Sequence, residues 1–165
     1  EAILQALYDG TVDAIATAHQ PCHADEKELD FAEAPAGVVG LETAVSLAVD
    51  RLVHGRVVGL VQLVRLMSTR PAEIFRLPGG TLKIGSPADL TLLDLRARRT
   101  GKPAAFASRS RNTPFAGLQL KGGPAATIKG FSSSRSPMWI RRSMVPPHLA
   151  YRSGRLWRSR PGIVL

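Results

Sequence analysis

The acidic residues of this 165-residue chain are confined to one part of it. All 13 lie at or before Asp94, together with 7 of the 22 lysines and arginines, so residues 1–94 carry a net charge of −6. Residues 95–165 hold the other 15 basic residues and no acid, which gives +15. The chain therefore combines two different kinds of sequence. Beyond Gly130 it is rich in Ser, Arg, Pro and Gly without a sustained helical or strand period, and we expect residues 131–165 to form a disordered basic tail.

Composition limits the remaining possibilities. With 44% apolar residues the chain can bury a moderate core. No apolar run approaches the roughly 20 residues that span a bilayer, and the start has no basic n-region of a secretory signal, so we expect a cytoplasmic protein without a membrane partner. The single cysteine, Cys22, excludes an internal disulfide and a cysteine-based zinc site.

The first half of the chain predicts helices around one strand. Residues 2–8 have helical spacing, and Asp9-Gly10 ends that helix. Residues 12–17 form a brief apolar run that is typical of a buried parallel strand, and in α/β barrels the ends of such strands hold the chemistry. The loop over residues 19–40 exceeds the length of about 15 residues beyond which loops are usually functional or disordered.

The second half of the ordered region changes period. Apolar spacing predicts an amphipathic helix over residues 41–53, ended by His54-Gly55, and a second helix over residues 60–68, with Pro71 beginning a further turn. Residues 79–85 and 88–95 are expected to be two strands joined by a turn. A small β-structure therefore follows the helices.

Three segments, in this order, resemble dihydroorotases of the amidohydrolase superfamily. The first runs from Asp9 to His23 and on to Ala44, where the family has Ala-Thr-Asp-His-Ala-Pro-His, then Ala-Pro-Phe-Gly and Gly-Leu-Glu-Thr-Ala. The second, within residues 67–91, is shared with many amidohydrolases, including hydantoinases. The third, residues 110–122, again resembles dihydroorotase. Together they cover roughly residues 1–130.

The resemblance implies an α/β fold. Family members form a zinc-dependent (β/α)₈ barrel with a small β-domain, and they interconvert dihydroorotate and carbamoyl aspartate in pyrimidine synthesis. It implies that residues 1–77 are the end of the barrel, with its last strand, substrate loop and helices, and that residues 78–130 are part of the small β-domain. The earlier strands and the family's His-X-His zinc ligands have no counterpart here. We therefore expect a C-terminal fragment of the barrel that binds no zinc.

The same resemblance assigns the site residues. Ala18 stands where the family has the aspartate that binds metal and moves the proton, and a methyl group does neither. Cys22 aligns with the histidine that contacts the substrate carboxylate in the family. Pro35 and Gly37, whose neighbourhood lines the substrate pocket in the family, are retained. We predict Cys22, Pro35 and Gly37 as substrate-binding residues, with no catalytic or metal-binding residue in this chain.

Several residues allow a second interpretation. His19 is either a metal ligand or a hydrogen-bonded structural residue, and we favour the latter. The charged residues 25–28 are either a gating loop or a solvated surface, and we favour the surface. A nucleophilic Cys22 would need a lowered thiol pKa and an oxyanion site, for which the sequence offers no sign.

Three functions remain open. The first is an inactive fragment of a dihydroorotase. The second is a non-catalytic dihydroorotase-like protein that is a structural partner, for instance of aspartate carbamoyltransferase. The third is nucleic-acid binding through the arginines and aromatic residues of the tail. Translation of a GC-rich gene in the wrong frame gives the same tail composition, and we favour that explanation because the change comes where the family's β-domain finishes, at residues 127–130.

Overall fold

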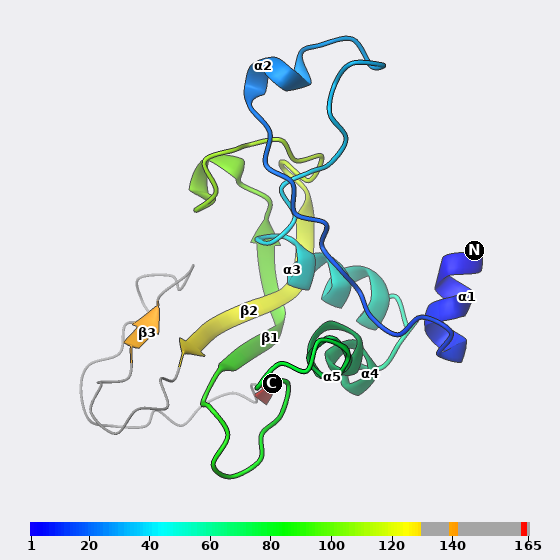
Figure 1. Ribbon diagram of the computed structural model, residues 1–165, viewed down its shortest axis with the longest axis vertical. Coiled ribbons are helices and arrows are strands. Elements are labelled where there is room, and N and C mark those ends of the chain that lie inside the picture. The colour runs from blue at the N-terminus through cyan, green and yellow to red at the C-terminus, as the bar shows by residue number, and fades with distance from the viewer. Residues whose placement is uncertain (130–138, 142–162, 165) are drawn as a thin grey trace.

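The computed structural model describes residues 1–129, 139–141 and 163–164. Within them most of the helices precede the sheet, as the colours of Figure 1 show. The helical elements are α1 (Ala2–Asp9), α2 (Ala24–Lys27), α3 (Ala44–Ala48), η1 (Val49–Val53), α4 (Leu60–Val64), η2 (Arg65–Thr69), α5 (Arg70–Ile74) and η3 (Pro103–Ala105). The strands are β1 (Leu90–Thr100), β2 (Gln119–Lys129), β3 (Trp139–Arg141) and β4 (Ile163–Val164).

The predicted helices are present, with some of their turns wound as π-helix. Helix α1 ends at Gly10, whose left-handed φ of 83° suits a glycine C-cap. The helix expected over residues 41–53 is α3 continued by the π-helix η1, and His54 caps its end. The second run, α4 to α5, changes from π to α hydrogen bonding near Pro71, which has no N–H to donate. The expectation that Pro71 begins a further helical turn is confirmed.

The sheet is antiparallel with the strand order β3-β2-β1-β4. Its two long strands, β1 and β2, pair from Leu90 opposite Ile128 to Thr100 opposite Gln119. The register shifts twice, between Leu92 and Leu93 and between Asp94 and Arg98. Such shifts bend and twist a strand pair.

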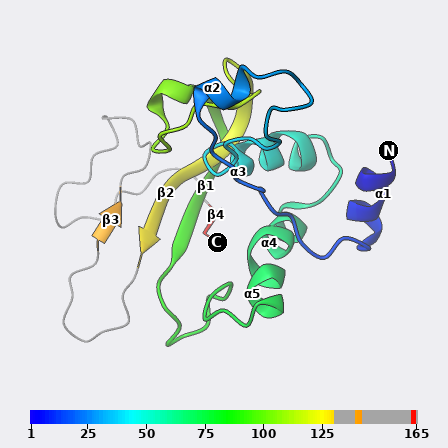
Figure 2. The same ribbon diagram turned by 45° about the horizontal axis from the view of Figure 1, so that its top comes forward.

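One apolar core joins the helices to β1. Val49 from η1 and Leu93 from β1 are among its fully buried side chains, and Leu63 and Leu66 cover them from α4 and η2. Figure 2 shows α4 and α5 beside β1, with α3 above them. The core fixes the base from which the loop over residues 19–40 projects.

Two predicted strands are absent from the described structure. Residues 12–17 run without strand pairing, and their side chains are exposed or half-buried rather than buried. Residues 79–85 form bends and turns rather than a strand. Both segments have the apolar residues that a strand needs. A strand also needs a neighbouring segment with which to exchange hydrogen bonds, and these two have none in the described structure. Conversely, β1 extends to Thr100, beyond the strand predicted at residues 88–95.

The remaining differences are local. The long loop contains one short helix, α2. The prediction of a disordered tail concerns residues 131–165, nearly all of which lie outside the described residues. Among the helices described here, none has the length and apolar character needed to cross a bilayer.

Candidate functional site

The site is built on the stem of the loop over residues 19–40. His19 and Val38 form a parallel bridge, and the amide of Gln20 donates to the carbonyl of Val38 at 2.9 Å. Gly37 has a φ of 108°, and a Cβ there would lie 2.5 Å from Oε1 of Gln20. Only glycine fits this position, because both the backbone conformation and the close side chain exclude a larger residue.

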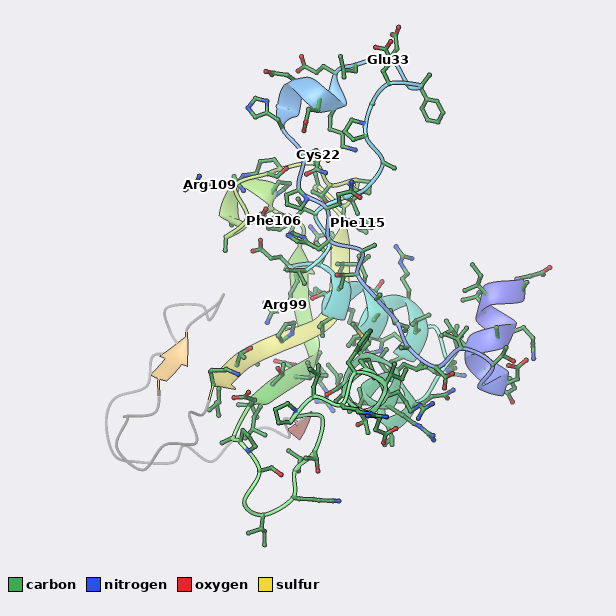
Figure 3. The ribbon with its side chains drawn as sticks, in the orientation of Figure 1. Cys22, Glu33, Arg99, Phe106, Arg109 and Phe115 are labelled. Carbon is green, nitrogen blue, oxygen red and sulfur yellow. The ribbon has the colours of Figure 1, made fainter. Side chains whose placement is uncertain are left out.

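A second segment, distant in sequence, holds the stem closed. The amide of Cys22 donates to Oγ of Ser110 at 3.1 Å and to Oδ1 of Asn112 at 3.3 Å. Nδ2 of Asn112 donates to the carbonyls of Gln20 at 3.0 Å and Gly37 at 3.3 Å. We call this arrangement of residues 19–22, 37–42 and 107–112 the loop clasp. Figure 3 shows Cys22 close to the turn that carries Arg109.

Two charged side chains complete the clasp. Both carboxylate oxygens of Glu42 accept backbone N–H groups, from Ala107 at 2.9 Å and from Ser108 at 3.1 Å. Nζ of Lys27 donates to the carbonyl of Gly37 at 3.0 Å and also to that of Pro35. Lys27 therefore joins α2 to the returning half of the loop, and hydrogen bonds to charged groups are among the stronger ones in proteins.

A cavity of about 680 Å³ opens between the loop and residues 108–112. Its cationic wall contains Lys27, Arg109 and Arg111, and His23 also lines it; Glu28 is the acidic residue among those that form it. The guanidinium of Arg111 donates to the carbonyls of Ser108 and Ser110. The side chain of Arg109 is exposed and has no hydrogen-bond or ionic partner within residues 1–129. This wall has the charge and the N–H donors to receive a carboxylate.

The segment that leads into the loop is much less connected. Among residues 12–18, only the amides of Val12 and Ile15 donate backbone hydrogen bonds within the described chain, to the carbonyls of Ala6 and Leu66. Asp13 is tied to Arg70 by an ion pair of 2.7 Å, and the hydrogen bonds from Arg70 to Asp13 and Glu73 raise the pKa of Arg70. The other amides of this segment have no hydrogen-bond partner within the described residues.

Ala18, at the end of that segment, has a φ of 45°. This is the left-handed region, which costs an alanine roughly 1–2 kcal/mol and which aspartate and asparagine adopt more readily. The methyl group is exposed. The backbone here suits the aspartate of the family motif better than it suits the residue present.

The histidines of the described residues do not fit a zinc site. Nδ1 of His19 accepts the amide of Gly40 at 3.1 Å, so in the neutral ring the proton is on Nε2, which then donates rather than ligates. Nδ1 of His23 accepts the amide of Asp25 in the capping box of α2, and Nε2 of His54 lies 2.9 Å from the carbonyl of Leu95. Within the described residues, no three His, Cys, Asp or Glu side chains converge as a metal-binding group. The structural interpretation of His19 agrees with this geometry.

Asn112 links Cys22 and Gly37 in the loop clasp, but of the three predicted substrate-binding residues Cys22 alone is among those that line the cavity. Cys22 is half-buried and lines the cavity, whereas the known contacts of Pro35 and Gly37 are with Lys27, Gln20 and Asn112 at the loop stem. Their binding role stays a prediction. Asn112, Glu42 and Lys27 were given no individual role by the sequence analysis, because their partners lie in other segments or in carbonyl groups that no periodicity marks.

Comparison with known proteins identifies the family of this chain. The profile of the Amidohydrolase family matches residues 1–155. The chain belongs to the amidohydrolase family. It is 48% identical over 130 residues to a dihydroorotase of Halalkalibacterium halodurans, and 50% identical over 129 residues to one of Geobacter metallireducens. These alignments cover 79% and 78% of this chain but 30% of each relative, so the chain spans less than a third of their length.

Solved amidohydrolase structures share the fold. An L-hydantoinase from Arthrobacter aurescens superposes with a TM-score of 0.73 at 30% identity, over 77% of this chain and 29% of that one. A dihydropyrimidinase from Brevibacillus agri gives 0.72 at 27% identity, over 78% and 29%. The expected fold class, a part of an amidohydrolase barrel with part of its small β-domain, is confirmed.

Proposed function

We propose that this amidohydrolase chain is the C-terminal part of a dihydroorotase-type protein of the cytoplasm, and that it does not hydrolyse dihydroorotate by itself. Its similarity to dihydroorotases over residues 1–130 supports the substrate class. The observation that carries the second half of the proposal is Ala18: a methyl group in a left-handed conformation at the position of the family's catalytic aspartate.

The chemistry explains why that position matters. Opening a cyclic amide requires a base for the attacking water and a proton for the leaving nitrogen. Ala18 has no ionisable group. His19 uses Nδ1 to accept the amide of Gly40, and His23 uses its Nδ1 at the start of α2. The donor set described here does not fit the family's zinc ion, so we derive no step through a metal.

The role that remains for this part is substrate recognition. The loop clasp holds Cys22 at the edge of the cavity, and the wall formed with Arg109 and Arg111 offers positive charge. Dihydroorotate and carbamoyl aspartate both carry carboxylates. In this proposal the clasp orients a substrate carboxylate while the missing earlier part of the barrel supplies the reacting groups.

The test is a fusion that completes the barrel. The upstream part of the Halalkalibacterium halodurans dihydroorotase is joined to this chain, and dihydroorotate hydrolysis is measured with Ala18, with Ala18→Asp and with the matched control Ala16→Asp. We expect the Ala18→Asp fusion to exceed the other two by about 10²–10⁴-fold, the range of general acid–base catalysis. The chain alone should show no turnover. Chelator-sensitive hydrolysis by the chain alone would overturn the proposal.

A second function is supported by the same residue. The loss of the carboxylate at Ala18 beside an intact loop clasp suits a catalytically degenerate dihydroorotase-like protein that acts as a structural partner of aspartate carbamoyltransferase. Co-elution of the fusion with aspartate carbamoyltransferase, together with no recovery of activity in Ala18→Asp, favours this function. Recovery of activity without co-elution favours the first.

A further inference from the structure

A second, separate hollow lies between α3 and the two long strands. It has a volume of about 270 Å³ and is lined by Ser46 from α3, by Arg98 and Arg99 from β1, and by Lys102 just beyond it. This is smaller than typical drug-sized ligand pockets of about 300–1,000 Å³, so it suits a small ligand or a single functional group. It shares Glu42 with the loop clasp but none of the arginines of the first cavity.

Arg99 is the unusual residue in this hollow. Its Nε is the one buried side-chain nitrogen or oxygen without a hydrogen-bond partner in the described part of the chain. The guanidinium is anchored through Nη2, which donates to the carbonyl of Pro124. Burial lowers the pKa of Arg99, against the opposing charge of Asp94. A buried donor without an acceptor is unfavourable, so an acceptor at this point is favoured.

Gly123 lies beside two polar atoms of residues that line the hollow. Its φ is 149°, and a Cβ at this position would lie 2.8 Å from Nε of Arg99 and 2.3 Å from Oγ of Ser46. Two polar atoms thus approach the same point above the backbone of β2. The hydroxyl of Ser46 makes no hydrogen bond within the described residues and keeps some contact with solvent, although the residue is only 5% exposed. Both atoms can donate to a third group.

The electrostatics of the hollow favour an anion. Arg98, Arg99 and Lys102 contribute three positive charges, and the side chains of Arg98 and Lys102 make no hydrogen bond or ion pair among residues 1–129. Glu42 is the carboxylate on the wall, and its two oxygens already accept the amides of Ala107 and Ser108. Glu42 and Asp94 offset part of the positive charge, and the three cations still outnumber these two carboxylates.

We propose that this hollow is a binding site for a phosphate group, with Nε of Arg99 and Oγ of Ser46 as the central donors and Arg98 and Lys102 at the rim. Arginine binds phosphate through directed N–H groups that a lysine cannot reproduce. The ligand is either inorganic phosphate or the phosphate of a monoester. The site does not depend on the substrate proposed for the loop clasp.

The test is calorimetric titration of the chain with inorganic phosphate, phenyl phosphate and acetate at constant ionic strength. We expect phosphate or its monoester to bind with a Kd on the order of 1 mM or tighter. Arg99→Lys, which keeps the charge, and Ser46→Ala should each weaken binding about tenfold, the effect of one lost hydrogen bond. Arg96→Lys, an exposed arginine on the same strand, is the matched control and should change Kd less than about twofold.

The variants also distinguish phosphate binding in the hollow from phosphate binding by the basic tail. Residues 131–165 contain seven arginines, all of which are retained in every variant, so tail binding would be unaffected by Arg99→Lys. A phosphate-dependent shift of the Arg99 Nε–H resonance, measured by NMR, gives a direct signal from the site. Binding of phenyl phosphate alone assigns the site to a monoester. Equal affinity in wild type and Arg99→Lys, or equal binding of acetate, would overturn the proposal, and so would an unchanged Nε–H resonance.

Discussion

The loop clasp and the extended segment before it, residues 12–18, differ in how many of their backbone amides are hydrogen-bonded. In the clasp, Cys22, Val39 and Gly40 donate their amides to side chains or carbonyls of other segments. In residues 12–18, the amides of Asp13, Ala14, Ala16, Thr17 and Ala18 have no hydrogen-bond partner in the described structure. The clasp thus finds its hydrogen-bond partners within the described residues, whereas most amides of residues 12–18 find none there.

Hydrogen exchange should show this contrast at its largest. We expect the amides of Gln20, Cys22 and Val39 to exchange at least about 10²-fold more slowly than those of Ala14, Ala16 and Thr17, because exchange of a hydrogen-bonded amide requires local opening. Residue-resolved exchange by NMR measures the ratio. Similar rates in both sets would mean that the clasp opens as freely as the segment before it.

Removing the central side chain of the clasp should have the next largest effect. Asn112→Ala deletes the hydrogen bonds to Gln20, Gly37 and Cys22, whereas the amide of Cys22 keeps Oγ of Ser110 and the carbonyl of Gly37 keeps Nζ of Lys27. We therefore expect a cost of about 1–2 kcal/mol in the free energy of unfolding. Urea denaturation measures it. The control is Gln119→Ala, an exposed amide on β2, which should stay within about 0.5 kcal/mol. An equally small loss for Asn112→Ala would show that the loop does not depend on this side chain.

The sequence predicted the helices better than the strands because helical hydrogen bonds are local. The apolar face that includes Val45, Ala48 and Val49 specifies a helix whatever surrounds it, and the structure has one there. The strand expected at residues 12–17 has the apolar residues of a strand, but no described segment pairs with it as one. The same holds for residues 79–85, where three glycines and a lysine interrupt a short apolar pattern.

The site could be predicted only in part. Motif resemblance drew attention to Cys22 and to residues 110–112, which the fold brings together across about 90 residues of sequence. It gave no role to Lys27, which belongs to a charge run that was interpreted as solvated surface. Its ammonium instead bonds the carbonyls of Pro35 and Gly37. Such a contact depends on where a loop returns, and residue type alone does not contain that information.

The smallest expected effect is a change in stability at Ala18, where the extended segment meets the loop clasp. Ala18 is held at a φ of 45°, and asparagine adopts this conformation several-fold more often than alanine, so Ala18→Asn should stabilise the chain by about 0.5 kcal/mol. Ala16→Asn is the matched control, since Ala16 is exposed on the same segment with a negative φ, and it should bring no gain. Urea denaturation of both variants provides the measurement. A gain confined to Ala18→Asn means that the backbone keeps a conformation suited to an Asx side chain although the carboxylate is gone. Equal changes in the two variants would mean that the turn adapts to whatever residue occupies it.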